Sequence, residues 1–181
     1  VDEFARQIRQ ELDYRLEGRN AQTCQSNCAG DPQGGVPKVY WLYTRARVLT
    51  LEWLQGTQLA DVDTLPFSLD ERRELAYRIA DTWMAMIFRH GFFHGDPHPA
   101  NIMVLEEAGT IGLVDFGAVG KLSDDDMSKL TRMFIDAAQE NVDILPKRLS
   151  DLGVRFPKER EEAFKAELRE AYDIGYLLLF S

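Results

Sequence analysis

Three polar residues have the types and spacing that phosphoryl transfer requires. Asp96 and Asn101 stand five positions apart in the segment HGDPHPAN (residues 94–101), and Asp115 follows in LVDFGAVG (residues 113–120). The reaction needs a carboxylate that orients the acceptor hydroxyl and oxygen ligands that hold a metal ion on the phosphates. The pattern predicts that Asp96 is the orienting carboxylate or base, that Asn101 serves catalysis as a metal ligand, and that Asp115 is the principal metal ligand.

Two elements must position these residues. Ser68 with Glu71 three positions later is a capping-box pattern, and the apolar residues that follow at helical spacing predict a long buried helix over residues 68–91. After the loop, residues 101–117 predict a β-hairpin. Such a hairpin would return the principal metal ligand to the side of the loop.

Two simpler interpretations compete with this one. The three histidines, His90, His94 and His98, are four positions apart and would form a metal-binding stripe on a helix. Prolines within the segment exclude that helix, because proline lacks a donor and clashes with the preceding turn. We therefore interpret His94 and His98 as groups that brace the loop. Asp and Asn also favour turns, but turn formation alone does not explain the joint order of the loop and the later Asp-Phe-Gly.

The remaining segments predict an α+β architecture with segregated elements. Residues 2–22 have the apolar spacing of an amphipathic helix, whereas residues 23–37 are rich in turn formers. Residues 38–54 contain two β-rich runs and predict a hairpin. Beyond these, helices are predicted over residues 123–140, 142–151 and 157–176.

Composition limits the function classes. With 181 residues, 45% of them hydrophobic and 28% charged, the chain can bury one sizeable core or two small lobes. Its net charge of −9 argues against a nucleic-acid groove, where cations must neutralise phosphates. Cys24 and Cys28 lack a second pair, so we interpret them as loop thiols in a reducing compartment and not as a zinc site. The longest apolar run, residues 176–180, is far shorter than the roughly 20 residues of a membrane-spanning helix.

Three motifs together resemble a known family. In this order, ELDYRLEGRN (residues 11–20), the loop at residues 94–101 and VDFGAVGKL (residues 114–122) are similar to motifs of the UbiB family of atypical kinases, within the protein-kinase-like superfamily. Aminoglycoside and choline kinases have a similar His-x-Asp-x4-Asn loop, so the loop alone does not decide between them. The Glu-x-Asp pair in the first motif favours UbiB.

The resemblance implies a protein-kinase-like α+β fold that uses ATP and Mg²⁺. Residues 1–54 would be a truncated N-lobe, made of helix C and a β-hairpin, and residues 55–181 a mainly helical C-lobe that is incomplete at its C-terminus. Glu52, Trp53 and Leu54 would form the hinge between the lobes, whose backbone binds adenine. The alternative for these three residues is an ordinary buried strand end.

The first motif would serve the nucleotide site. By resemblance, Glu17 is the helix-C glutamate that pairs with a nucleotide-binding lysine, while Glu11 and Asp13 meet a family-specific N-terminal segment at the cofactor. Asp13 and Glu17 are four positions apart and would share a helix face, whereas Glu11 would point elsewhere. The alternative is that these acidic residues form a solvated helix face.

Two departures from the family pattern lead to further expectations. No lysine or alanine-rich phosphate loop precedes Glu17, so we expect a piece of a longer protein that binds ATP weakly and is inactive by itself. Ser123, the expected helix start, follows Gly117 by six positions. That distance is too short for an activation segment that holds a peptide, so the acceptor is expected to be a small molecule, a lipid such as a quinone precursor, or water in an ATPase.

The resemblance also gives expectations for partners and location. UbiB-type proteins support isoprenoid-quinone lipid biosynthesis at membranes, which implies a cytoplasmic or organelle-matrix protein that associates peripherally with a membrane and binds no nucleic acid. Two alternatives stay open at this point. One is a small-molecule phosphotransferase of the aminoglycoside or choline kinase type, and the other is a non-catalytic scaffold that keeps the kinase fold.

Overall fold

The computed structural model describes residues 13–29, 34–105, 110–155 and 157–180. The chain forms two compact units, residues 1–121 and 122–181. The first unit contains, in chain order, α2 (Tyr14–Asn27), β1 (Gly34–Gly35), β2 (Gly56–Gln58), the 3₁₀ turn η1 (Leu59–Thr64), α3 (Leu69–Phe88), β3 (Phe92–His94), η2 (Pro99–Asn101), β4 (Ile102–Leu105), β5 (Ile111–Leu113) and β6 (Val119–Lys121). The second unit contains α4 (Asp124–Ala138), η3 (Val142–Ile144), α5 (Leu145–Asp151), η4 (Lys158–Arg160) and α6 (Glu161–Phe180).

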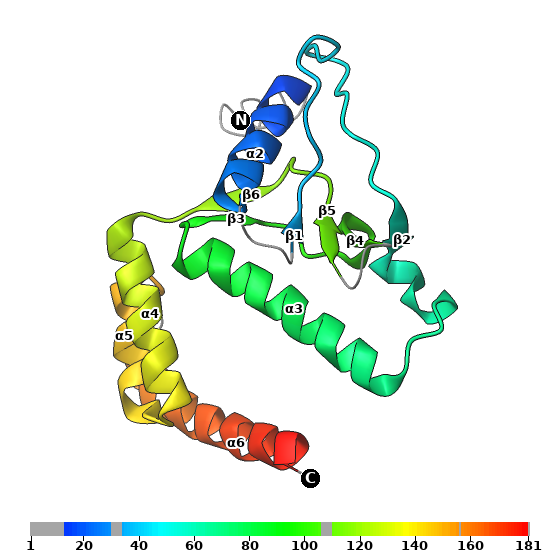
Figure 1. The fold of residues 1–181 in the computed structure, drawn as a ribbon. Helices are drawn as coiled ribbons and strands as arrows, with labels where there is room; N and C mark the ends of the chain where they lie inside the picture. The colour runs from blue at the N-terminus through cyan, green and yellow to red at the C-terminus, as the bar shows by residue number, and fades with distance from the viewer. Residues whose placement is uncertain (1–12, 30–33, 106–109, 156, 181) are drawn as a thin grey trace. The chain divides into compact units, whose positions relative to one another are not determined.

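The strands of the first unit form a four-stranded and a two-stranded sheet (Figure 1). The larger sheet has the order β1-β5-β4-β2, with β1 parallel to β5 and the other pairs antiparallel. β4 and β5 pair with Ile102 opposite Leu113, which confirms the hairpin predicted over residues 101–117. In the smaller sheet β3 pairs with β6, and His94 lies opposite Val119. These registers bring the loop before β4 and the segment after β5 to the same end of the hairpin.

The long helix α3 leads into the predicted catalytic loop. Its N-terminus has the full capping box, in which the Ser68 hydroxyl accepts from the Glu71 backbone N–H and the Glu71 carboxylate accepts from the Ser68 backbone N–H. After Phe88 the chain turns at Gly91, whose φ of 57° lies in the left-handed region that glycine adopts without strain. The predicted helix and its approximate end are confirmed.

Helix α2 extends further toward the C-terminus than the sequence predicts. α2 continues to Asn27, so the turn predicted from residue 23 onward is wrong for the first five of those residues, and Cys24 lies in a helix instead of a loop. Cys24 is 1% exposed, and its Sγ lies 3.8 Å from Met86 Sδ on α3. The Thr23 and Ser26 hydroxyls donate to backbone carbonyls one turn back. These local bonds satisfy the hydroxyl groups, and burial of the Cys24 thiol offsets the weak helix propensity of the segment.

Residues 38–54 pair as a hairpin but form no regular strand. Two isolated bridges, Val39 with Leu51 and Arg45 with Val48, connect the two runs. Between them the Tyr43 backbone N–H donates to the Tyr40 carbonyl at 3.0 Å, so a turn begins earlier than the sequence predicts. The hairpin is confirmed as a pairing of two runs, with its regular β structure reduced to single bridges.

One apolar core holds the first unit together. It joins α2, α3 and both sheets, and its buried members are Ala21, Cys24, Val36, Val39, Leu75, Met86, Phe92, Ile102, Val104, Ile111, Leu113 and Phe116. Phe116 is 1% exposed and belongs to the Asp-Phe-Gly motif. The motif residue next to the predicted metal ligand is therefore anchored by hydrophobic burial.

The second unit is helical, as the sequence predicts. α4 begins at Asp124, directly after the predicted start Ser123, which is its N-cap: the Ser123 hydroxyl accepts from the Asp126 backbone N–H at 3.1 Å. α5 is joined to α4 by a partly buried ion pair between Arg148 Nε and Asp136 Oδ2 at 2.7 Å. In the described part of the chain, no helix combines the length and hydrophobicity that a membrane span requires.

Candidate functional site

Asp96 and Asn101 contact each other, as their spacing predicts. Asn101 Nδ2 donates to Asp96 Oδ2 at 3.0 Å, and the His98 backbone N–H donates to Asp96 Oδ1 at 3.3 Å. His98 in turn caps η2, since its Nδ1 accepts from the Ala100 backbone N–H at 3.1 Å. The loop thus fixes an exposed carboxylate by its own hydrogen bonds, while the prolines restrict its backbone.

His94 connects this loop to the segment that carries Asp115. The ring is 2% exposed; its Nε2 donates to the Val114 carbonyl at 3.0 Å, and its Nδ1 accepts from the Asp96 backbone N–H at 3.2 Å. These partners require a neutral ring with its proton on Nε2. The ring also packs edge-on against Phe116, with centroids 5.1 Å apart. The predicted bracing role of His94 is confirmed, and the contacts of His98 confirm the same role for that residue.

Asp115 stands at the end of the hairpin in a strained conformation. Its φ of 62° is in the left-handed region, which costs a residue with a side chain about 1 kcal/mol or more. The strand pairing continues to its neighbour, because the Val114 backbone N–H donates to the Asn101 carbonyl at 3.0 Å. The Gly117 backbone N–H donates to Asp115 Oδ1 at 3.3 Å. The hairpin therefore places the predicted metal ligand just after β5, beside Asn101 at the start of β4.

Helix α2 contributes Glu17 and a residue that sequence reasoning missed, Asn20. Burial first, and the negative charge of Asp115 second, raise the pKa of the half-buried Glu17 carboxyl, while a hydrogen bond from the Phe116 backbone N–H acts in the opposite direction. Asn20 Nδ2 donates to the Phe116 carbonyl at 3.0 Å. The available signal for Asn20 was its position three residues after Glu17, which places both side chains on one helix face.

The donor set suits a hard divalent cation. The Asn101 amide nitrogen is committed to Asp96, so its amide oxygen is the atom available to a metal, and Asp115 adds an exposed carboxylate. Mg²⁺ is usually bound by one or two protein oxygens together with water and substrate phosphates. Among the described residues there is no cluster of three or more His, Cys, Asp or Glu side chains suited to a metal ion. These residues fit Mg²⁺ held partly by phosphate and do not form an all-protein metal cage.

Of the two acidic residues at the start of the first motif, the structure describes only Asp13. Glu11 lies outside the described residues. Asp13 is the N-cap of α2 and has an extended backbone, with its side chain accepting from the backbone N–H of Arg15 at 3.1 Å. Hydrogen bonding to the Arg15 side chain lowers the pKa of Asp13 to about 2. Asp13 thus precedes the helix instead of sharing a helical face with Glu17, and its contact with an N-terminal segment stays a prediction.

The predicted hinge is an extended segment with one buried contact. Glu52 pairs with Lys38, whose backbone N–H donates to Glu52 Oε2 at 3.0 Å. Trp53 is 85% exposed. Leu54 packs over Gly112, where a Cβ would meet Leu54 Cδ1 at 2.8 Å, so a larger residue there would displace the Leu54 side chain. Adenine binding by these residues stays a prediction.

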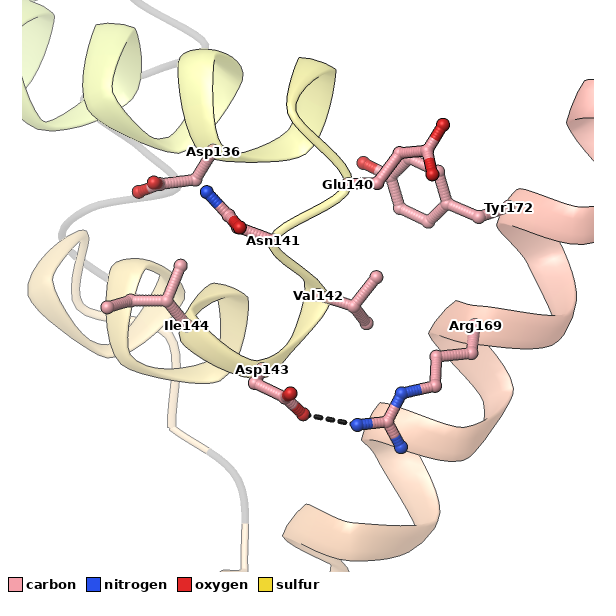
Figure 2. Close-up of a pocket in the computed structure, with 8 residues that line it drawn as sticks. All are labelled: Asp136, Glu140, Asn141, Val142, Asp143, Ile144, Arg169 and Tyr172. Carbon is pink, nitrogen blue, oxygen red and sulfur yellow. Dashed lines mark hydrogen bonds and ion pairs between the residues drawn. The ribbon is translucent and has the colours of Figure 1, made fainter.

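A cavity in the second unit does not include any predicted site residue. It has a volume of about 510 Å³ and is lined by residues from the end of α4, from η3 and from α6 (Figure 2). Arg169 and Asp143, both in its wall, form an ion pair. None of its lining residues belongs to a predicted motif, so we do not assign it to phosphoryl transfer.

Comparison with known proteins identifies the group to which this arrangement corresponds. Residues 1–148 match the family model described as the ABC1 atypical kinase-like domain. The chain is 38% identical over 161 residues to the protein sll1770 of Synechocystis, and 36% identical over 138 residues to the probable protein kinase UbiB of Pseudomonas aeruginosa. It is 31% identical over 157 residues to ACTIVITY OF BC1 COMPLEX KINASE 8, chloroplastic, of Arabidopsis thaliana.

These alignments cover much of this chain and little of its relatives. They include 89%, 75% and 86% of the chain, but 27%, 26% and 21% of the three relatives, so the chain spans about a quarter of their length.

The fold is similar to the solved structure of Rv3197 in complex with erythromycin from Mycobacterium tuberculosis. That match has a TM-score of 0.67 at 28% identity and covers 89% of this chain and 41% of the other. The predicted protein-kinase-like fold is confirmed.

Proposed function

Because the chain belongs to the ABC1 atypical kinase-like family, we propose that it forms the catalytic-loop and metal-ligand part of an ATP-dependent kinase or ATPase. The observation that carries the proposal is the hydrogen bond between Asp96 and Asn101, beside a hairpin that ends at Asp115. The family match favours this reading over an aminoglycoside or choline kinase, whose motifs share only the loop.

Each residue has a defined task in this proposal. Asp96 accepts the proton of an acceptor hydroxyl or of water, or orients that group, because hydrogen bonds to both of its oxygens fix its carboxylate. Asn101 and Asp115 would hold Mg²⁺, which when bound neutralises charge on the phosphates. Glu17 would pair with a lysine that binds the nucleotide. Within the described residues neither Glu17 nor Asp115 forms an ion pair, so a nearby cation would lower their mutual repulsion.

We further propose that the acceptor is a small molecule, a lipid or water. The segment after the Asp-Phe-Gly motif is short and occupied: Val119–Lys121 pairs with β3, and α4 starts at Asp124. This leaves little chain to hold a peptide in extended form. The similarity to UbiB extends the proposal to isoprenoid-quinone lipid metabolism, with the protein on the cytoplasmic or organelle-matrix side and bound peripherally to a membrane.

Calorimetric titration of ATP with and without Mg²⁺ tests the nucleotide site. Since the relatives are longer, the titration uses both this chain and the complete product of its gene. We expect Mg²⁺-dependent binding by the complete product and weaker binding by the chain alone. Asp115→Asn should lower the Mg²⁺-dependent affinity by about 100-fold or more, the upper end of what losing a group that supports a metal ligand costs.

Asp81→Asn is the control, because it removes an exposed carboxylate of α3 outside the motifs. If neither protein binds ATP, or if both substitutions have the same effect, the proposed site is wrong and a non-catalytic scaffold takes its place. ATP labelled at the γ-phosphate then identifies the acceptor: label released as phosphate indicates an ATPase, label on added lipid a lipid kinase, and label on protein contradicts the proposed acceptor class.

A further inference from the structure

Helix α2 holds the backbone of Phe116 by a side-chain hydrogen bond. Asn20 Nδ2 donates to the Phe116 carbonyl at 3.0 Å, and the Glu17 carboxyl lies near the Phe116 N–H, which favours its charged form. The two side chains are three residues apart, so they project from the same face of the helix. Asn20 lies 96 positions before Phe116, so this bond joins parts of the chain that are distant in sequence.

The Asn20 bond continues through a peptide unit to the Asp115 carboxylate. The Phe116 carbonyl and the Gly117 N–H belong to one planar trans peptide, so they point to opposite sides. Asn20 holds the carbonyl side, and the N–H side donates to Asp115 Oδ1 at 3.3 Å. A rotation of this peptide would break both hydrogen bonds at once. The orientation of the Asp115 carboxylate therefore depends on a side chain of α2.

The strained backbone of Asp115 makes such support necessary. A non-glycine residue with φ of 62° persists only where surrounding contacts fix it. His94 holds the preceding residue through the Val114 carbonyl, whereas α2 holds the following one. With Oδ1 engaged by Gly117, Oδ2 is the oxygen that the carboxylate presents to a cation.

We propose that Asn20 is a positioning residue, which orients the Asp115 carboxylate for the cation by holding the peptide between Phe116 and Gly117. The proposal rests on the proposed function, because the cation is the Mg²⁺ of the nucleotide site. It also couples α2 to that site: a shift of the helix would change the orientation of the Asp115 carboxylate as well as the position of Glu17. An amide suits this task because it donates a hydrogen bond without adding a charge beside the carboxylates of Glu17 and Asp115.

The test compares Asn20→Ala with Gln25→Ala in the complete gene product. Gln25 is the matched control: it lies on the same helix, it is partly buried, and its Nε2 donates to a backbone carbonyl, that of Val36, at 3.2 Å. Alanine is a better helix former than either amide, so loss of the hydrogen bond is partly offset in both variants and the helix is kept.

Two readouts separate positioning from stability. In Asn20→Ala, the Mg²⁺ concentration that gives half-maximal ATP binding should rise about 10-fold, the lower end of what losing a group that supports a metal ligand costs. ATP binding in the absence of Mg²⁺ should be unchanged. Amide hydrogen exchange over residues 114–118 of the ligand-free protein should become faster. Gln25→Ala should change neither quantity. Asn20→Asp, which cannot donate to the carbonyl, should be at least as severe as Asn20→Ala.

The outcomes distinguish this proposal from the proposed function. Equal Mg²⁺ dependence in Asn20→Ala and Gln25→Ala would overturn the positioning role, even if exchange is faster. If the unchanged protein binds no ATP, the proposed function fails, and the exchange comparison decides the positioning: faster exchange only in the Asn20 variants supports it, and equal exchange overturns it.

Discussion

Two segments with predicted roles at the nucleotide are held in different ways. The metal-ligand segment, Val114–Gly117, has hydrogen bonds to β3, to η2 and to α2, and buries Phe116 in the core. The hinge segment, Glu52–Leu54, is bonded to a neighbouring run at Lys38, and its central residue is 85% exposed. The protein itself fixes the predicted metal-ligand segment and constrains the predicted hinge much less.

This difference teaches which contacts preorganise the site. Catalysis by electrostatics needs dipoles and ligands that are already oriented before the reaction, and the metal-ligand segment meets that requirement through partners from three other elements. A hinge binds through its backbone, which extended structure provides with few side-chain contacts. The predictions below test whether the two segments differ in stability as much as their contacts do.

The largest expected difference is between Phe116→Ala and Trp53→Ala. Truncating a fully buried phenylalanine should lower the free energy of unfolding by about 3–5 kcal/mol. Truncating the exposed tryptophan should change it by less than about 0.5 kcal/mol. Urea denaturation of the 181-residue chain, followed by circular dichroism, measures both values. If both variants lost a similar free energy of unfolding, the predicted hinge would be buried in solution, and the two segments would not differ as described.

A smaller effect is expected from His94→Phe. The phenyl ring keeps most of the buried volume but leaves the Val114 carbonyl and the Asp96 N–H without their partner, which should cost about 2 kcal/mol. The same denaturation experiment applies. His98→Ala is the control, because His98 is exposed and water can replace its bond to the Ala100 N–H. If the His98 variant loses as much stability, the loop is braced from its surface and not through His94.

Local rules made much of this site predictable. The capping box located the start of α3, hydrophobic pattern and turn residues located the β4–β5 hairpin, and prolines excluded a helix through the histidines. The spacing of Asp96 and Asn101 indicated a shared loop, and the structure joins them by a hydrogen bond. These features depend on residues close in sequence, where backbone preferences and nearby hydrogen bonds decide the conformation.

Features that depend on distant partners were not predictable. α2 passes its expected end because Cys24 packs on Met86, 62 positions later, and tertiary burial overrides weak helix propensity. The position of Asn20 three residues after Glu17 indicated a shared helix face but not its partner, because the partner carbonyl belongs to a residue 96 positions away. Asp13 is a local exception: it was expected inside a helix, whereas the hydrogen bond that it accepts from the Arg15 N–H makes it the N-cap. A single sequence shows which residues can make such contacts but does not identify their partners.

The smallest expected effect is a difference in how Asp13 and Glu17, both in the first motif, make stability depend on pH. Hydrogen bonding to Arg15 lowers the pKa of Asp13 from 3.8 to about 2, so the charged form is favoured in the fold. Its contribution to stability is present above pH 3.8 and is lost as the pH falls toward 2. Burial and the charge of Asp115 raise the pKa of Glu17 above 4.5, so its contribution has the opposite sign. It is fully present below pH 4.5 and is lost as the pH rises through the raised value.

Melting temperatures of Glu17→Gln and Asp13→Asn between about pH 2 and 7 test this opposition, the range covering both titrations. Glu17→Gln should remove part of the loss of stability above pH 4.5, and Asp13→Asn should remove part of the loss below pH 3.8. Each slope corresponds to less than one proton, so the effect on melting is small. Mg²⁺ with ATP should flatten the Glu17 slope, because a cation near Asp115 favours the charged carboxylates. If Glu17→Gln leaves the slope above pH 4.5 unchanged, Glu17 is solvated and α2 does not approach the metal-ligand segment as described.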